Sequence, residues 1–196
     1  MAAVVDPGQR KILIAGDVRG RLAALYKRVA AVHGSAAGPF DAVFCVGAFF
    51  DGPAAVGTGA GAVAAGDGAA DSPAFNSELR AYIDGTATAP IPTYFVDALP
   101  HGRAFCRDPE GKVAPNITFL NKPGVLDLHG LRVAVLPGRY NDISYKDTSK
   151  VAASAAAAEG EYRHDDVQAL KAAHFADGCG VVDLLLTSEW PRGVDA

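Results

Sequence analysis

Short residue pairs, three of which contain a polar side chain, follow four apolar runs of the sequence, at positions where a parallel sheet would bring them together. The pairs are Gly16-Asp17, Gly47-Ala48, Asp97-Ala98 and Ser188-Glu189. Because open α/β sheets bind ligands beyond the carboxyl ends of their strands, we expect the four pairs to cluster into one site. A carboxylate such as that of Asp17 is suited to a metal ion, and the guanidinium of Arg19 is suited to phosphate oxygens.

Other catalytic signatures are absent from the sequence. The stretch 16–20 lacks the Lys-Ser/Thr end of a P-loop and the three glycines of a dinucleotide-binding turn, and no Gly-x-Ser-x-Gly elbow occurs. The three cysteines are widely spaced and predict buried, unpaired side chains: Cys45, Cys106 and Cys179. Four histidines lack metal-ligand spacing and are interpreted as structural or surface residues: His33, His129, His164 and His174.

Two periodicities in the sequence indicate an α/β domain. Apolar runs with β-branched or aromatic residues occur at 12–15, 42–46, 93–96, 117–120, 131–136 and 181–187, and several of them are near-continuous, as is typical of strands covered on both faces. Apolar residues recur at three- and four-residue intervals over 22–32 and 167–174, which predicts helices. This order predicts a layered α/β sandwich with a largely parallel inner sheet.

Length and composition favour a single domain over residues 1–196, with a flexible Gly/Ala-rich insertion at 52–74. The Ala-rich stretch 151–161 is compatible with a short helix or a disordered link. No secretory signal or membrane-spanning run is present, so we expect an intracellular protein without membrane contact. The formal net charge is −4, and the densest basic stretch, 19–28, is expected to be a solvated helix face rather than a nucleic-acid site.

Four ordered stretches resemble a known family of proteins. They are 15–22 (AGDVRGRL), 40–50 (FDAVFCVGAFF), 89–96 and 181–191 (VVDLLLTSEWP). Together they resemble the metallophosphoesterase domain of the RNA lariat debranching enzymes and, more closely, the Cwf-nineteen-like splicing factors. The resemblance implies a metallophosphoesterase-like layered sandwich of mixed β-sheets flanked by helices. The family continues into further domains, so the chain is expected to be the N-terminal portion of a longer protein.

The first two motifs depart from the metal-binding pattern of the active enzymes. Asp17 keeps the carboxylate of the first motif, but Arg19 stands where the resemblance implies a histidine. Ala48 stands where the second motif implies the metal-bridging aspartate. An arginine pointing at a divalent cation 4 Å away would cost about 8 kcal/mol at an effective dielectric constant of 20.

The last two motifs depart from it as well. Asp97 stands at the asparagine ligand of the third motif, and His101 follows the expected histidine position by one residue. Ser188 replaces the metal-binding histidine of the fourth motif, as in the Cwf-nineteen-like branch, and Glu189 and Trp190 follow it. We therefore expect no catalytic residue, no metal ligands and no cofactor, and a vestigial cleft with seven candidate contact residues: Asp17, Arg19, Ala48, His101, Ser188, Glu189 and Trp190.

These residues also have structural interpretations. Asp17 is expected to cap the following helix or to order the turn, and Arg19 to pair with Asp17 or Glu189 or to contact phosphate. Trp190 is expected to pack at a strand end rather than to stack on a base.

The resemblance implies a nuclear role in pre-mRNA splicing, at the stage where the intron lariat is released and debranched. It implies as partners the spliceosomal proteins of the intron lariat complex, the lariat debranching enzyme and, through that assembly, the intron RNA. The favoured function is a non-catalytic interaction module. Two alternatives stay open at this point: an RNA phosphodiesterase with an atypical metal site, and an RNA-binding module that uses the vestigial cleft.

Overall fold

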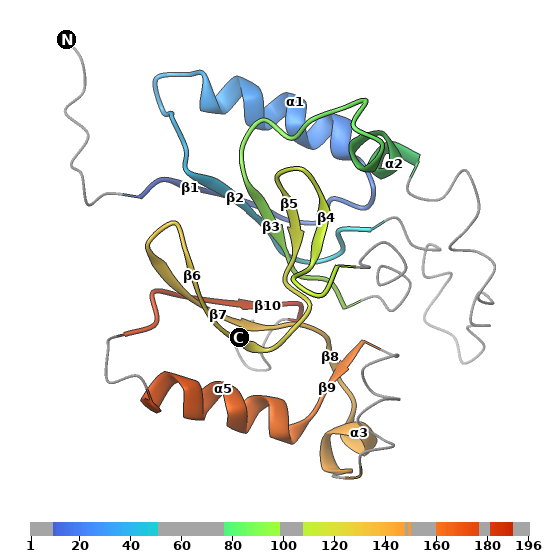
Figure 1. The fold of residues 1–196 in the computed structure, drawn as a ribbon, viewed down its shortest axis with the longest axis vertical. Coiled ribbons are helices and arrows are strands. Elements are labelled where there is room, and N and C mark those ends of the chain that lie inside the picture. The colour runs from blue at the N-terminus through green and yellow to red at the C-terminus, as the bar shows by residue number, and fades with distance from the viewer. Residues whose placement is uncertain are drawn as a thin grey trace, which may run out of the picture.

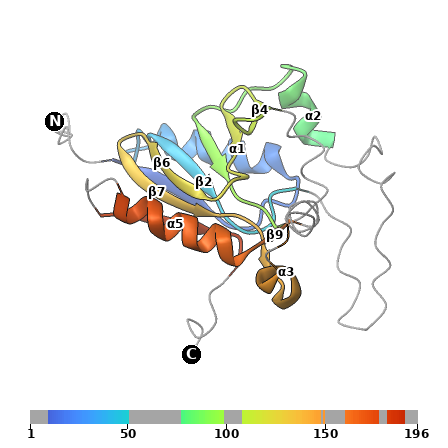
Figure 2. The same ribbon diagram turned by 60° about the horizontal axis from the view of Figure 1, so that its bottom comes forward.

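The computed structural model describes residues 10–50, 77–98, 108–147, 149, 160–176 and 181–189. In these ranges two β-sheets lie face to face, with helices on their outer sides (Figure 1). Helices α1 (Leu22–His33) and α2 (Ser77–Ile83) lie on one side, and α5 (His164–Ala176) runs along the other side (Figure 2). The layered α/β fold expected from the sequence is confirmed.

The first sheet is largely parallel, as predicted. Its strands follow the order β1-β2-β3-β5-β4, in which only the β4–β5 pair is antiparallel. Their bounds are β1 Ile12–Ala15, β2 Ala42–Cys45, β3 Thr93–Phe95, β4 Lys112–Ala114 and β5 Ile117–Phe119. Parallel pairing of β1, β2 and β3 places the residues that follow these strands at one edge of the sheet.

The second sheet has the order β10-β7-β6, with bounds β6 Gly124–Leu128, β7 Leu131–Leu136 and β10 Leu184–Thr187. The apolar run predicted as a strand from residue 181 thus becomes one only at Leu184. Val181 is 80% exposed, and Asp183 is joined to Arg132 by hydrogen bonds in both directions. A small parallel pair, β8 (Arg139–Tyr140) and β9 (Glu161–Tyr162), lies beside the short helix α3 (Asp142–Lys146).

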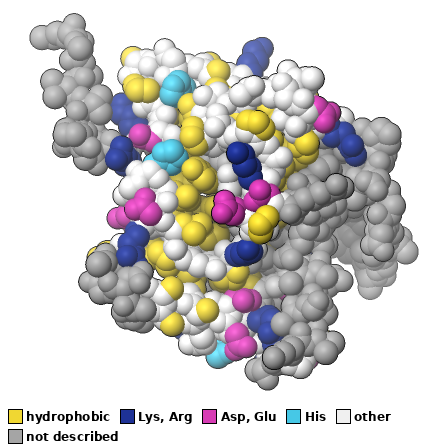
Figure 3. All heavy atoms as spheres, in the orientation of Figure 1, with side chains coloured by type: hydrophobic (Ala, Val, Ile, Leu, Met, Phe, Trp, Pro, Cys, Tyr) yellow, Lys and Arg dark blue, Asp and Glu magenta, His cyan; other side chains and the backbone are white. Residues whose placement is uncertain are grey.

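Charged side chains on the surface are mixed in sign. On the face drawn in Figure 3, acidic and basic side chains lie interspersed, without a broad patch of one sign. Among the described residues, no helix combines the length and the apolar character needed to cross a membrane.

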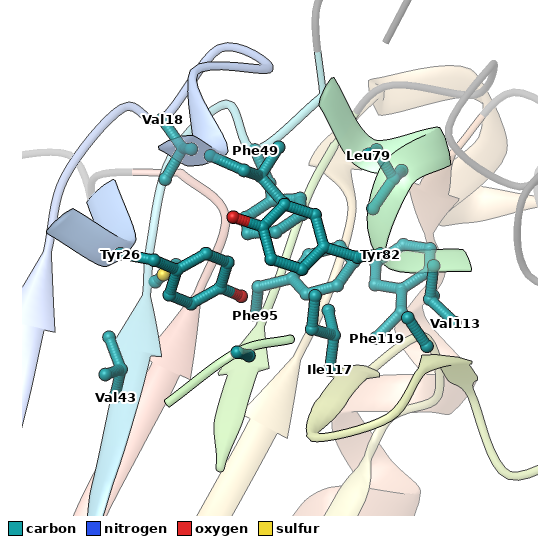
Figure 4. Close-up of a cluster of buried hydrophobic side chains, with 14 of the residues drawn as sticks. Val18, Tyr26, Val43, Phe49, Leu79, Tyr82, Phe95, Val113, Ile117 and Phe119 are labelled. Atoms are coloured by element: carbon teal, nitrogen blue, oxygen red, sulfur yellow. The ribbon is translucent and has the colours of Figure 1, made fainter. Parts of the chain in front are cut away.

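An aromatic core joins the first sheet to helices α1 and α2 (Figure 4). The rings of Phe49 and Phe95 stack with centroids 3.7 Å apart, and Phe95 stacks on Phe119 at 4.8 Å. Each such side chain buries a large apolar area, so the core anchors the backbone that carries it. Because Phe49 comes directly after β2 and its loop, this packing fixes the loop that contains Ala48.

Candidate functional site

A cleft of about 620 Å³ opens between the carboxyl ends of β1 and β2 in the first sheet and of β10 in the second. It is lined by Gly16, Asp17, Val46, Gly47, Ala48, Leu185, Thr187, Ser188 and Glu189. Three of the four pairs expected at the strand ends therefore come together. We call this feature the inter-sheet cleft.

Both carboxylate oxygens of Asp17 are engaged. Oδ2 accepts hydrogen bonds from Nε and Nη2 of Arg19, at 3.0 and 2.6 Å, and Oδ1 accepts from the N–H of Ala48 at 3.1 Å. The hydrogen bonds from Arg19, with that from Ala48, lower the pKa of Asp17 below its ordinary value. Asp17 is thus an anion that already has its counter-charge, and of the two partners expected for Arg19 the structure shows Asp17.

The loops after β1 and β2 are tied together through their backbones. The N–H groups of Val18 and Arg19 both donate to the Ala48 carbonyl, at 2.9 and 3.0 Å, and Gly20 donates to Phe49. Arg19 adopts a left-handed backbone conformation with φ of 49°, which is uncommon for a residue with a side chain. Asp17 therefore orders this turn and does not cap α1, whose N-cap residue, Arg21, makes no side-chain capping bond.

Gly47 is required by the close approach of Asp17. Its φ is +80°, and a Cβ atom at this position would lie 2.2 Å from Oδ1 of Asp17. Glycine adopts this backbone conformation without strain and leaves the Asp17 carboxylate its space.

Asp97 does not line the inter-sheet cleft, contrary to the expectation that all four pairs would meet there. Its side chain is buried, and Oδ2 accepts hydrogen bonds from the N–H groups of Phe49 and Phe50 at 2.8 and 3.0 Å. Because these two amides are buried with their phenylalanines, they need an acceptor inside the protein. Asp97 supplies it and thereby anchors the loop after β2.

The polar residues after β10 also bind loop backbone. Ser188 Oγ accepts a hydrogen bond from the N–H of Gly138 at 3.1 Å, and Glu189 Oε2 accepts from the N–H of Tyr140 at 2.7 Å. Glu189, the other partner expected for Arg19, is therefore bound to the β8 segment. These two hydrogen bonds were not predicted from the sequence, because they join residues about 50 positions apart in the chain.

The β8–α3–β9 unit is organised by one buried carboxylate. Glu161 accepts hydrogen bonds from Ser144 Oγ at 2.5 Å, from Asn141 Nδ2 at 2.9 Å and from Arg139 at 3.4 Å. Burial by itself would raise the pKa of Glu161, but these hydrogen bonds and the charge of Arg139 outweigh it, so the pKa is lowered. The unit is thus held together by Glu161 and is joined to Glu189 through the N–H of Tyr140.

A dinuclear metal centre does not fit these residues. Such a centre needs carboxylate, imidazole and amide donors that converge on two ions. The inter-sheet cleft instead combines Asp17, whose carboxylate is paired with the Arg19 guanidinium, with Ala48 and Ser188. Across the part of the chain that the structure describes, no three His, Cys, Asp or Glu side chains form a group able to hold a metal ion. His101 and Trp190, two further candidates, lie outside the described residues.

Comparison with known proteins identifies relatives that match nearly the whole chain. CWF19-like protein 1 homolog of Drosophila melanogaster is 32% identical over 202 residues, covering 99% of this chain. The resemblance to the Cwf-nineteen-like proteins is confirmed. Zinc finger CCCH domain-containing protein 59 of Oryza sativa subsp. japonica is 37% identical over 94% of the chain, and the lariat debranching enzyme of Schizosaccharomyces pombe is 30% identical over 58% of it. No family model matches the chain.

The chain spans only part of the length of these relatives. The matched regions make up 27% of the rice protein, 32% of the Drosophila protein and 25% of the debranching enzyme. The homology therefore concerns one region of each relative.

Proposed function

We propose that the chain is a non-catalytic, metallophosphoesterase-like interaction module of a pre-mRNA splicing factor that acts at the intron-lariat stage. The observation that carries the non-catalytic part is the ion pair between Asp17 and Arg19 in the inter-sheet cleft. The similarity to CWF19-like proteins and to a lariat debranching enzyme supports the splicing part.

The chemistry of the cleft favours binding over catalysis. Hydrolysis of a phosphodiester needs an activated water and positive charge aimed at the phosphate. The charge of Arg19 is directed at Asp17, and the acceptors of Ser188 and Glu189 are engaged by loop amides. The hydrogen bonds of Asp17, Ser188 and Glu189 therefore hold the loops around the cleft, which suits a rigid contact surface.

We further propose that the protein works in the nucleus and contacts spliceosomal proteins of the intron lariat complex and the lariat debranching enzyme. Contact with intron RNA would then arise through this assembly. The net charge of −4 supports a protein partner over a free polyanion.

Two assays on the protein test the proposal. The first incubates the purified chain with a 2′,5′-branched RNA and manganese; we expect no cleavage, and the variant Asp17→Ala should be indistinguishable from the parent. The second isolates an epitope-tagged chain from nuclear extract; we expect enrichment of intron lariats and of the debranching enzyme over a tag-only control.

The alternatives give different results. Manganese-dependent cleavage that Asp17→Ala abolishes would establish a phosphodiesterase. Binding of purified RNA with a steep salt dependence, lost in Arg19→Ala, would establish an RNA-binding module. Absence of both lariats and debranching enzyme from the isolate would contradict the splicing role.

A further inference from the structure

A second groove lies on the other side of β1, between the first sheet and α1. It has a volume of about 630 Å³. Leu13 and Ala15 line it from the strand, and Leu25 and Val32, both half-buried, line it from the helix. The two clefts share Gly16 and Asp17 but otherwise have separate walls. We call this feature the β1 groove.

The strand that borders the groove has an open edge. Among the described strands, β1 pairs only with β2. The carbonyl of Ala15 accepts a hydrogen bond from Val46, so Ala15 directs its backbone groups toward β2. Because these directions alternate along a strand in a parallel pair, Ile12 and Ile14 direct their N–H and C=O groups to the open side. The edge therefore offers the backbone groups that a further strand would use.

An apolar side chain lies exposed at this edge. Ile12 packs against the core between the sheets, and Ile14, two residues on, lies on the same face. In the β1–β2 register Ile14 is beside Phe44, which is fully buried, whereas Ile14 is 65% exposed. The face of β1 that is turned toward the second sheet is thus apolar at both Ile12 and Ile14, but Ile14 is left uncovered.

Two arginines stand at the groove on the α1 side. Arg21 and Arg28 are exposed, line the groove and have no ion-pair partner among the described residues. They are seven residues apart, two helical turns, so their positions on the helix are separated by roughly 10 Å along its axis. The two guanidinium groups therefore favour a negatively charged ligand in the β1 groove.

From this geometry we propose that the β1 groove binds an extended segment of a partner protein, which adds to the first sheet as a strand beside β1. Its side chains alternate between apolar residues, which pack beside Ile14 on the inner face, and acidic residues, which face Arg21 and Arg28. Main-chain hydrogen bonds provide affinity in this binding mode, and the alternating side chains provide specificity. Alternate residues of a strand are about 7 Å apart, so two or three acidic residues span both arginines.

This inference goes beyond the proposed function, because it assigns a surface and a ligand class that are independent of the inter-sheet cleft. If the peptide does not bind, the lariat and debranching-enzyme result is unaffected. If lariats are not enriched, peptide binding can still be measured.

The test uses a fluorescent ten-residue peptide of alternating Val and Glu, an alternating Val and Lys peptide, and a ten-nucleotide oligouridine. Fluorescence anisotropy should show binding of the Val-Glu peptide only. The double variant Arg21→Glu/Arg28→Glu should weaken it at least ten-fold. The matched control Lys27→Glu/Lys171→Glu has the same charge change at two exposed helix positions outside the groove and should bind normally.

A second arm tests strand addition. Two versions of the Val-Glu peptide are N-methylated, one at its odd-numbered and one at its even-numbered backbone nitrogens. Binding should be lost in one version, whose methylated nitrogens face β1, and kept in the other. Ile14→Pro, which removes both the outward-facing N–H and the exposed Ile14 side chain but no donor of the β1–β2 ladder, should also abolish binding. Equal binding of both methylated peptides, binding unchanged by the Arg21/Arg28 reversal, or oligouridine binding that depends on these arginines in place of peptide binding would each overturn the proposal.

Discussion

Asp97 is expected to contribute strongly to the stability of the fold, because it holds the loop after β2 that borders the inter-sheet cleft. In Asp97→Ala the N–H groups of Phe49 and Phe50 lose their shared acceptor, yet both residues stay buried, at 1% and 0% exposure. Leaving a buried donor unsatisfied costs roughly 1–3 kcal/mol, so two donors predict a loss of about 2–6 kcal/mol. Since natural domains are stable by only about 5–15 kcal/mol, this is a large fraction of the total.

Urea unfolding of the purified chain, monitored by far-UV circular dichroism, measures this loss. The midpoint should fall while the dependence of the free energy on urea is unchanged. Asp97→Asn is the matched control, because its amide oxygen still accepts from the Phe49 and Phe50 amides; it should lose less than half as much stability. A free energy of unfolding of Asp97→Ala within about 0.5 kcal/mol of that of the parent is typical of a neutral surface change. Such a result would show that the Phe49 and Phe50 amides do not need the Asp97 carboxylate.

Three further predictions concern the turn around Asp17. Gly47→Ala should lower the melting temperature by several degrees, because the left-handed conformation costs about 1–2 kcal/mol and the new Cβ displaces the Asp17 carboxylate; an unchanged melting temperature would contradict the close approach. Arg19→Ala should cost at most about 1 kcal/mol, because the ion pair is largely exposed. In the same variant the pKa of Asp17 should rise toward 3.8, the ordinary value. Because the folded-state pKa of Asp17 is lowered in the parent, its stabilisation is present above the ordinary pKa and fades as pH falls through the lowered one. NMR titration of the Asp17 carboxyl carbon checks this, and an equal pKa in parent and variant would refute it.

The main strands were predictable because each is a compact apolar run. Strands β1, β2, β3, β5 and β7 follow the predicted runs to within a residue at each end. The two-residue strands β8 and β9 could not be predicted, since they are too short to show a period and are held by Glu161, 20 residues from its partner Asn141. Helix α2 was also missed, because seven residues give only two turns of periodicity.

The location of the site was predictable from the sequence, but most of its hydrogen-bond partners were not. The rule that ligand sites lie beyond parallel strand ends placed Asp17, Ala48 and Ser188 together, as the cleft does. The rule failed for Asp97, which turns into the core because two buried amides need its oxygen. This requirement depends on contacts of Asp97 with Phe49 and Phe50, which precede it by 48 and 47 residues, and the linear sequence does not reveal such contacts.

The metal content of the purified chain decides whether the inter-sheet cleft holds a dinuclear centre. Elemental analysis after dialysis, followed by calorimetric titration with manganese and zinc, measures both retained metal and affinity. We expect background metal and no saturable heat, because Arg19 is bound to the Asp17 carboxylate and Ala48 has no donor atom in its side chain. Two tightly bound equivalents would contradict this expectation and would make the phosphodiesterase alternative the leading function.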